Sequence, residues 1–237
     1  MQLDVREAAQ LFSVSEKTIY RWIKAGSLPG YRVQGQYRFN RAELLEWATA
    51  KSIPIDPARF EESAPADSDS GPVTLASALA AGGIHHEVPG NDKASVLAAV
   101  VDLVPLPPTS DRAFLLRVLL SRESLGSTGI GEGIAVPHVR NPIVLHASRP
   151  SATLCFLAHP VDFASLDGVP VHTLFTLITP NVRSHLHLLA RLAHALRTPA
   201  FRAAVERRAD AHDIVAAAEA IDRDLAAPGS SRAGDGP

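Results

Sequence analysis

The chain has 237 residues, of which 46% are hydrophobic and 20% are charged, and its formal net charge is −2. This composition is that of an ordinary globular protein of one or two domains, and it excludes binding to nucleic acid through overall positive charge. The single cysteine, Cys155, excludes a disulfide framework, and no signal-peptide pattern or run of about 18 apolar residues is found. We therefore expect a cytoplasmic protein without a membrane segment.

The first 60 residues begin with two short helical patterns. Leu3–Phe12 is expected to be an amphipathic helix, because apolar residues recur on one side of it. Ser15 is a good N-cap for a second helix over residues 16–24, and Gly26 followed by Pro29 ends that helix. The apolar residues of the second helix have core spacing, whereas its basic residues fall on the outer side.

A hairpin and a third helix follow. The segments Tyr31–Val33 and Tyr37–Phe39 flank a turn that contains Gly35, which predicts two antiparallel strands. Asn40 then caps a further helix. The large apolar residues of this helix are Leu44, Leu45 and Trp47.

This order of elements, over the run VREAAQLFSVSEKTIYRWIKAGSLPGYRVQGQYRF, resembles the winged helix-turn-helix DNA-binding domains of MerR regulators and excisionases. The first 60 residues also carry nine basic and six acidic side chains, so this segment is locally positive. The resemblance implies that the second helix enters the major groove of DNA. The candidate contacts are Lys17, Thr18 and Arg21 to base edges, Lys24 to phosphate, and Arg32 and Arg38 to the backbone or the minor groove.

Composition divides the chain into four segments. Residues 61–72 are acidic, small and rich in Pro and Ser, as in a flexible linker. We expect a DNA-binding domain over 1–54, a linker over 55–72, a second domain over 73–226 and a disordered tail over 227–237. No heptad run follows Lys51, so the long dimerisation coiled coil of MerR regulators is not expected.

The second domain alternates strand-like and helix-like patterns, which predicts a layered α/β fold. The expected strands are Ile84–Val88, Ile134–Val136, Thr153–Ala158 and Val171–Ile178. The expected helices are one that Asn91-Asp92 caps, one that Ser110 caps, His185–Arg197 with Ser184 as its cap, about Ala200–Arg208 and Ala211–Leu225.

A glycine-rich segment holds the most distinctive pattern of this domain. Four glycines occur within eight residues, at positions 126, 129, 131 and 133, and backbone N–H groups in such a loop can hold an anion. The loop lacks the Lys-Ser/Thr ending of a nucleotide P-loop, so ATP binding is not supported. Pro137 and His138 follow directly after a short apolar strand, which places an imidazole at the strand end.

The run RESLGSTGIGEGIAVPH closely resembles the enzyme IIA domains of the fructose/mannitol class in the phosphoenolpyruvate-dependent phosphotransferase system, including the nitrogen-regulatory IIA proteins. The similarity continues in PVDFASLDGVPVHTLFTLITP and SHLHLLARLAHALR. It implies a mixed sheet with flanking helices, and a histidine, here His138, that accepts phosphate from the carrier protein HPr through Nε2. The family's arginine matches Arg122 and the first histidine of its His-Leu-His motif matches His185.

The chemistry of these residues agrees with phosphoryl transfer. Neutral imidazole is nucleophilic near pH 7, and the Arg122 fork suits phosphoryl oxygens. We expect His185 in the first turn of its helix, where free N–H groups favour an anion, and His187 in a structural role. The expected phosphate loop consists of Ser127, Thr128, Gly129, Gly131 and Gly133. In-line transfer of this kind needs positioning and charge stabilisation, so neither metal nor cofactor is expected.

One position departs from the family pattern. Val139-Arg140 follows the histidine, where the family has glycine and then a basic residue. We expect the β-branched side chain of Val139 to stiffen the backbone and to crowd the approach of HPr.

Together the two domains predict a regulator that carries phosphohistidine and binds DNA. Two alternatives remain. The chain is either a transport IIA component that passes phosphate to a separate IIB domain, with a vestigial DNA-binding domain, or a DNA-binding protein whose IIA domain takes no phosphate.

Overall fold

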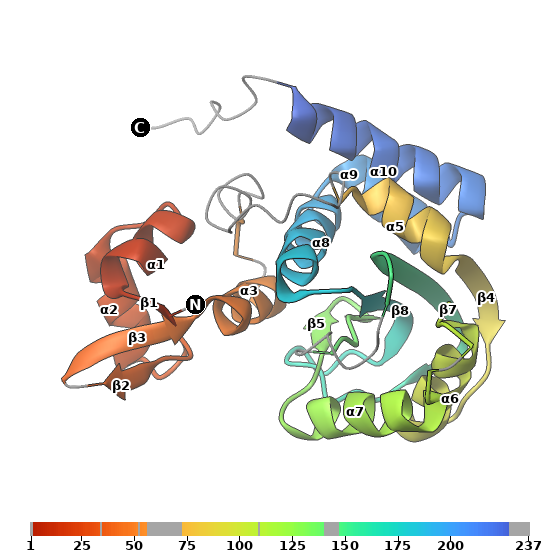
Figure 1. Cartoon of the computed structure of the whole chain (residues 1–237), viewed down its shortest axis with the longest axis horizontal. Coiled ribbons are helices and arrows are strands. Elements are labelled where there is room, and N and C mark those ends of the chain that lie inside the picture. The colour runs from red at the N-terminus through yellow and green to blue at the C-terminus, as the bar shows by residue number, and fades with distance from the viewer. Residues whose placement is uncertain are drawn as a thin grey trace.

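A computed structural model of the chain describes residues 2–33, 35–51, 53–55, 73–108, 110–139 and 147–227. These residues form a small N-terminal domain and a larger α/β domain that lie side by side (Figure 1). Of the predicted linker and tail, all but residues 55 and 227 lie outside the described residues.

The N-terminal domain combines three helices with a three-stranded antiparallel sheet of order β1-β3-β2. Its elements are β1 (Gln2–Leu3), α1 (Val5–Leu11), α2 (Glu16–Lys24), β2 (Tyr31–Val33), β3 (Gln36–Asn40) and α3 (Arg41–Ala50). The prediction that the first helix begins at Leu3 was wrong, because Leu3 pairs with Phe39 in the sheet. Asp4 caps α1 instead, and its carboxylate and that of Glu7 each accept a backbone N–H from the other residue.

Local caps and an aromatic core hold this domain together. The Ser15 hydroxyl accepts the Thr18 N–H at 3.2 Å and so caps α2, as predicted. Asn40 caps α3 in the same way. The rings of Phe12, Trp22 and Trp47 pack with centroid distances of 5.1–6.1 Å, which fixes α1, α2 and α3 around one centre.

The larger domain is built on a five-stranded mixed sheet of order β4-β7-β8-β6-β5. The strands are β4 (Ile84–Val88), β5 (Gly129–Gly131), β6 (Ile134–Ala135), β7 (Ser151–Val161) and β8 (Val171–Ile178). β7 and β8 pair antiparallel in the centre, while β4 and β6 pair parallel to them on either side. This confirms the layered α/β class with a mixed sheet.

Helices cover both faces of this sheet (Figure 1). The helices are α5 (Leu75–Gly82), α6 (Lys93–Leu103), α7 (Arg112–Ser124), α8 (Val182–Ala195), α9 (Pro199–Glu206) and α10 (Ala211–Ala226). α6 and α7 enclose one apolar core, and α5, α8, α9 and α10 enclose the other. The second core continues into the N-terminal domain, so the two domains share buried apolar surface.

Several expected boundaries of the larger domain were wrong. Asp111 rather than Ser110 caps α7. Asn181 rather than Ser184 caps α8, because its side chain accepts the Ser184 N–H at 2.8 Å. α5 and β5 were not predicted. Within the described part of the chain, no helix has the length and apolar character needed to cross a membrane.

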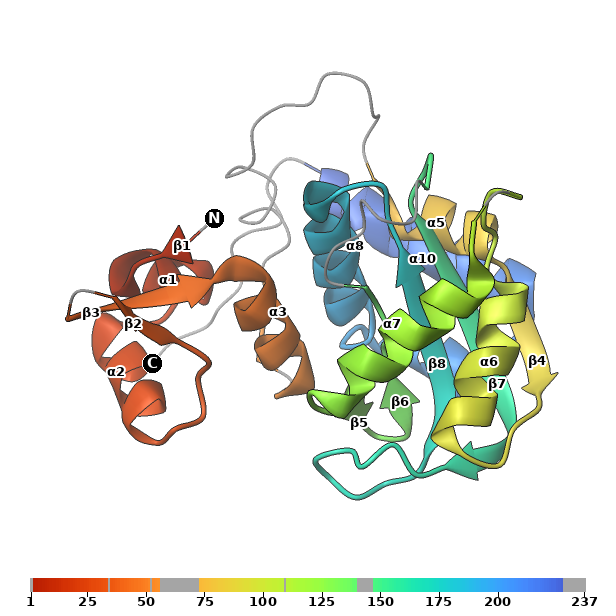
Figure 2. The same cartoon turned by 60° about the horizontal axis from the view of Figure 1, so that its bottom comes forward.

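α3 connects the two domains in space. It packs against α8 and β5 of the larger domain while its first residues continue from the small sheet (Figure 2). The C-terminal half of α3 therefore belongs to a surface that both domains form.

Candidate functional site

His138 lies just beyond β6, where its backbone still pairs with Leu177 of β8. The side chain is buried, with 3% of the residue exposed. Its Nδ1 atom lies 2.8 Å from the carbonyl oxygen of Val136, so the N–H at Nδ1 donates to that carbonyl. The lone pair of a neutral ring is then on Nε2, which is the atom that a nucleophilic histidine needs.

Arg122 reaches the same place from the last turn of α7. One guanidinium nitrogen, Nη1, donates to the carbonyl oxygen of Gly126 at 2.9 Å, which orients the planar group. The other, Nη2, donates to the Glu46 carboxylate at 2.8 Å. The structure thus brings His138 and Arg122 together, as the resemblance implied.

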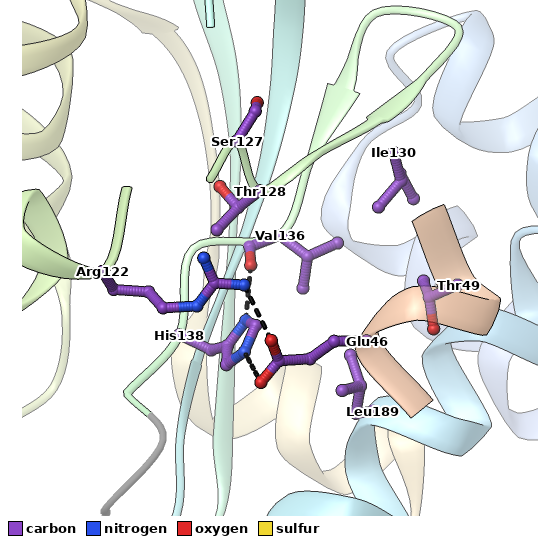
Figure 3. A pocket seen from close by; sticks show the side chains of 9 residues that line it. All are labelled: Glu46, Thr49, Arg122, Ser127, Thr128, Ile130, Val136, His138 and Leu189. Atoms are coloured by element: carbon purple, nitrogen blue, oxygen red, sulfur yellow. Dashed lines mark hydrogen bonds and ion pairs between the residues drawn. The ribbon is translucent and has the colours of Figure 1, made fainter. Parts of the chain in front are cut away.

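Glu46 is the residue that sequence reasoning missed. It comes from α3 of the N-terminal domain, and its carboxylate lies between the two predicted site residues (Figure 3). Oε1 is 3.1 Å from His138 Nε2, and Oε2 accepts from Arg122. The Glu46 side chain is only 9% exposed.

His185 lies behind His138, with 5.0 Å between the centroids of the two rings. Burial and, to a smaller extent, the neighbouring His138 lower the pKa of His185 to about 3 against an opposing effect of Glu46, so this imidazole is neutral at pH 7. The expectation of a place in the first helical turn was wrong. α8 begins at Val182, and the N–H of His185 already donates to the Asn181 carbonyl.

The predicted phosphate loop divides into two parts. Ser127 and Thr128 line the cavity beside His138, together with Glu46, Thr49, Arg122, Ile130, Val136 and Leu189. This cavity has a volume of about 30 Å³, which holds a water molecule or two. The Thr128 hydroxyl and N–H both donate to the buried Glu123 carboxylate, which Lys93 also contacts at 3.1 Å.

The three glycines of the predicted loop meet the segment that follows β7 and the start of β8. A Cβ on Gly129 would lie 2.1 Å from the Ser165 hydroxyl, and one on Gly133 would lie 2.4 Å from the His172 ring. Gly131 has a φ of +95° and lies near Asp167. Close packing and backbone conformation therefore require glycine at these positions.

Val139 is buried within the larger domain. Successive side chains of an extended segment point to opposite faces, so Val139 points away from His138. It is 4% exposed and lies in the core that α6 and α7 enclose. The expectation that this side chain crowds the approach of HPr was wrong, and Arg140 lies outside the described residues.

The candidate DNA contacts lie on α2 and on the hairpin of β2 and β3. Lys17, Arg21, Lys24 and Arg32 are exposed, and Thr18 and Arg38 are half-buried. The Arg32 guanidinium lies 5.7 Å from the centre of the Tyr37 ring, and Arg38 donates to the Gln36 side chain at 2.7 Å. None of these six residues lines the cavity at His138.

A buried histidine, an arginine fork and a second histidine beside a mixed α/β sheet are the arrangement expected of the enzyme IIA class of domains. The family model described as "Phosphoenolpyruvate-dependent sugar phosphotransferase system, EIIA 2" matches residues 78–220, and the chain belongs to this family. A second model, described as "Helix-turn-helix domain", matches residues 3–52.

Relatives of the larger domain agree with the family. A nitrogen regulatory protein of Pseudomonas aeruginosa is 41% identical over 112 residues, which cover 46% of this chain and 71% of that protein. A fructose-specific EIIABC component of Bacillus subtilis is 38% identical over 89 residues, which cover 37% of this chain and 14% of that protein. The crystal structure of the nitrogen regulatory protein IIA-Ntr from Neisseria meningitidis superposes with a TM-score of 0.50 at 26% identity, covering 56% of this chain and 91% of that one.

Proposed function

We propose that the chain is a phosphohistidine-carrying regulator of the phosphotransferase system. His138 accepts a phosphoryl group from an HPr-type phosphocarrier protein, and the N-terminal domain binds DNA. The observation that carries the first half is the position of the Glu46 carboxylate. An anion lies between the nucleophilic nitrogen of His138 and the guanidinium of Arg122, where a transferred phosphoryl group would also be held.

The residues divide the work of transfer among them. The Val136 carbonyl holds the Nδ1–H tautomer of His138, so that the Nε2 lone pair attacks phosphorus. The bond from phosphorus to the carrier breaks as the bond to Nε2 forms, and the carrier keeps that electron pair. Arg122 stabilises charge on the phosphoryl oxygens, and neutral His185 is suited to donate a hydrogen bond from one ring nitrogen.

The first test is phosphoryl transfer in a defined mixture. We would incubate the full chain with phosphoenolpyruvate, enzyme I and HPr, and measure the intact mass at neutral pH. We expect one added phosphate on the wild type and none on His138→Ala. A wild-type chain that stays unmodified, while a known IIA protein in parallel is phosphorylated, contradicts the proposal and leaves a DNA-binding protein with an inactive IIA domain.

The exposed face of α2 supports the DNA-binding half. Lys17, Arg21 and Lys24 extend into solvent from a helix whose other side packs in the domain core. Selection from a random duplex library, followed by anisotropy titration, should give a sequence-dependent affinity that falls with salt. Equal affinity for all duplexes would contradict sequence-specific regulation.

A transport function is the second candidate, because one relative is named as a fructose-specific component. A transport IIA component passes its phosphate to a IIB domain. Phosphorylated chain mixed with a fructose IIB domain distinguishes the two: rapid loss of phosphate to IIB favours transport, and retention favours regulation.

A further inference from the structure

The phosphate-accepting surface of the larger domain is covered by the DNA-binding domain of the same chain. α3 packs on α8 and β5, and both Glu46 and Thr49 line the cavity at His138 (Figures 2 and 3). Side-chain exposure is 3% for His138, 12% for Arg122 and 9% for Glu46. A protein partner cannot contact the reacting nitrogen in this arrangement.

The contact of Glu46 is directed at the reacting atoms themselves. Its carboxylate receives the Arg122 Nη2–H at 2.8 Å and stands 3.1 Å from His138 Nε2. A reacting phosphorus must come to about 3–3.5 Å from the attacking nitrogen, along the same lone pair. Carboxylate and phosphoryl group therefore compete for one position and for one arginine.

We propose that α3 is an intramolecular latch in which Glu46 stands in for the phosphoryl group, so that His138 accepts phosphate only after the DNA-binding domain has left this surface. The latch rests on the proposed function. It adds a rule for the order of events: the domains separate first, and transfer follows.

The competition acts in both directions. A phosphoryl group on Nε2 carries up to about two negative charges and would face the Glu46 carboxylate at contact distance. By linkage, the factor by which docked α3 disfavours phosphate is the factor by which phosphate disfavours docking. The phosphorylated chain should therefore hold its DNA-binding domain free.

The DNA-facing side of α2 is not part of the latch. Lys17, Arg21 and Lys24 are exposed while Glu46 is docked. The latch therefore acts directly on phosphate acceptance and on the position of the DNA-binding domain, without covering the recognition helix.

The test compares two alanine variants of α3 in the full chain. Glu46→Ala removes both contacts with the site. Glu43→Ala removes an equal charge one turn earlier, where the Tyr31 hydroxyl donates to the carboxylate at 2.8 Å, and serves as the matched control. We would measure the rate of phosphate transfer from phosphorylated HPr, and the radius of gyration by small-angle X-ray scattering.

We expect Glu46→Ala to accept phosphate about tenfold faster than the wild type, which corresponds to a wild-type open fraction of a tenth or less. Its radius of gyration should exceed that of the unphosphorylated wild type and match that of the phosphorylated wild type. Glu43→Ala should behave as the wild type in both measurements. An unchanged radius in Glu46→Ala overturns the latch, as does an unchanged rate in chains that take phosphate.

Failure of the proposed function is a separate outcome. If no variant takes phosphate while a known IIA protein does, the phosphocarrier function is wrong. In that case the scattering comparison still decides whether Glu46 holds the two domains together, because expansion of Glu46→Ala supports the docked contact and an unchanged radius refutes it.

Discussion

Two helices of the N-terminal domain use charge in opposite ways. α2 directs Lys17, Arg21 and Lys24 into solvent, whereas α3 directs Glu46 into the other domain, against Arg122 and His138. The basic residues of α2 do not line the cavity at His138, and their exposure suits them to bind a separate molecule. Glu46 on α3 instead has its partners within the chain. One small domain therefore carries both a surface suited to recognition and a contact suited to regulation.

Asp222 shows what a buried acidic residue does when its partners lie within one domain. Its carboxylate accepts the N–H groups of Leu75 and Ala76 at the start of α5, and Arg191 donates to it at 2.8 Å. Water can reach the Asp222 carboxylate only when the domain unfolds, whereas it can reach the Glu46 carboxylate when the two domains separate. Loss of Asp222 should therefore cost stability, and loss of Glu46 should cost only docking.

The largest expected effect follows from that difference. Asp222→Ala removes the carboxylate that accepts from two helix N–H groups and forms a buried ion pair with Arg191, and should lower the free energy of unfolding by roughly 3–5 kcal/mol. The change is measured by urea unfolding, followed by circular dichroism at about 222 nm. Helices contribute to this signal roughly in proportion to their content. Asp224→Ala, on an exposed position of the same helix, should stay within about 0.5 kcal/mol. Equal effects would show that Asp222 is not a structural partner.

His185 gives the second effect, which depends on pH. Its folded pKa of about 3 lies below the ordinary 6.5, so the unfolded chain binds the extra proton first. The contribution of neutral His185 to the free energy of unfolding is complete above pH 6.5. It is lost as pH falls toward 3, and the loss is about 3 kcal/mol at pH 4. His185→Asn should remove this part of the acid sensitivity, while His212→Asn, at an exposed position, should retain it. Parallel curves for His185→Asn and the wild type would contradict the prediction.

The exposed side of the comparison gives a third and smaller effect. Arg21→Ala should weaken binding to a selected DNA site by about 1–3 kcal/mol and reduce sequence preference, and Lys24→Ala should lower the salt slope by about one. Neither change should alter phosphate acceptance, since both residues lie outside the cavity at His138. Arg117→Ala on α7, where the side chain is 65% exposed, is the control for general charge. A changed transfer rate in Arg21→Ala would show that the charges on α2 influence phosphate acceptance, and would contradict the division of roles between α2 and α3.

Local patterns predicted those elements whose ends are decided locally. The bounds of α2 and β8 agree with the prediction, because a side-chain cap and an early glycine limit the first and a continuous apolar run defines the second. α5 was missed although Thr74 caps it locally; the second acceptor at its start, Asp222, is 146 residues from Ala76. β5 was missed because its strand is glycine-rich, and glycine is a poor indicator of strands.

The same reasoning explains the site. His138 and Arg122 were found through a long family motif, and the structure brings them together. Glu46 was missed because its partner Arg122 is 76 residues away and belongs to another domain. The available signal was the helix itself: Leu44, Leu45 and Trp47 place large apolar side chains on more than one side of α3, as in a helix that packs against two partners.

The smallest expected effect concerns the charge of the latch residue. Since the His138 N–H at Nδ1 donates to Val136, the Nε2 atom faces the Glu46 oxygen at 3.1 Å. Glu46→Gln keeps an oxygen that accepts from Arg122 and gains an amide N–H that can donate to Nε2. Near neutral pH it should therefore dock within about threefold of the wild type, a difference of less than about 0.7 kcal/mol.

Transfer rates of the wild type and of Glu46→Gln at one neutral pH, each divided by that of Glu46→Ala, measure this comparison. A ratio for Glu46→Gln close to that of the wild type would show that the positions of the two polar atoms hold α3 at this site. A Glu46→Gln chain that takes phosphate as fast as Glu46→Ala would contradict the prediction, and would show that the carboxylate charge facing Arg122 holds the latch.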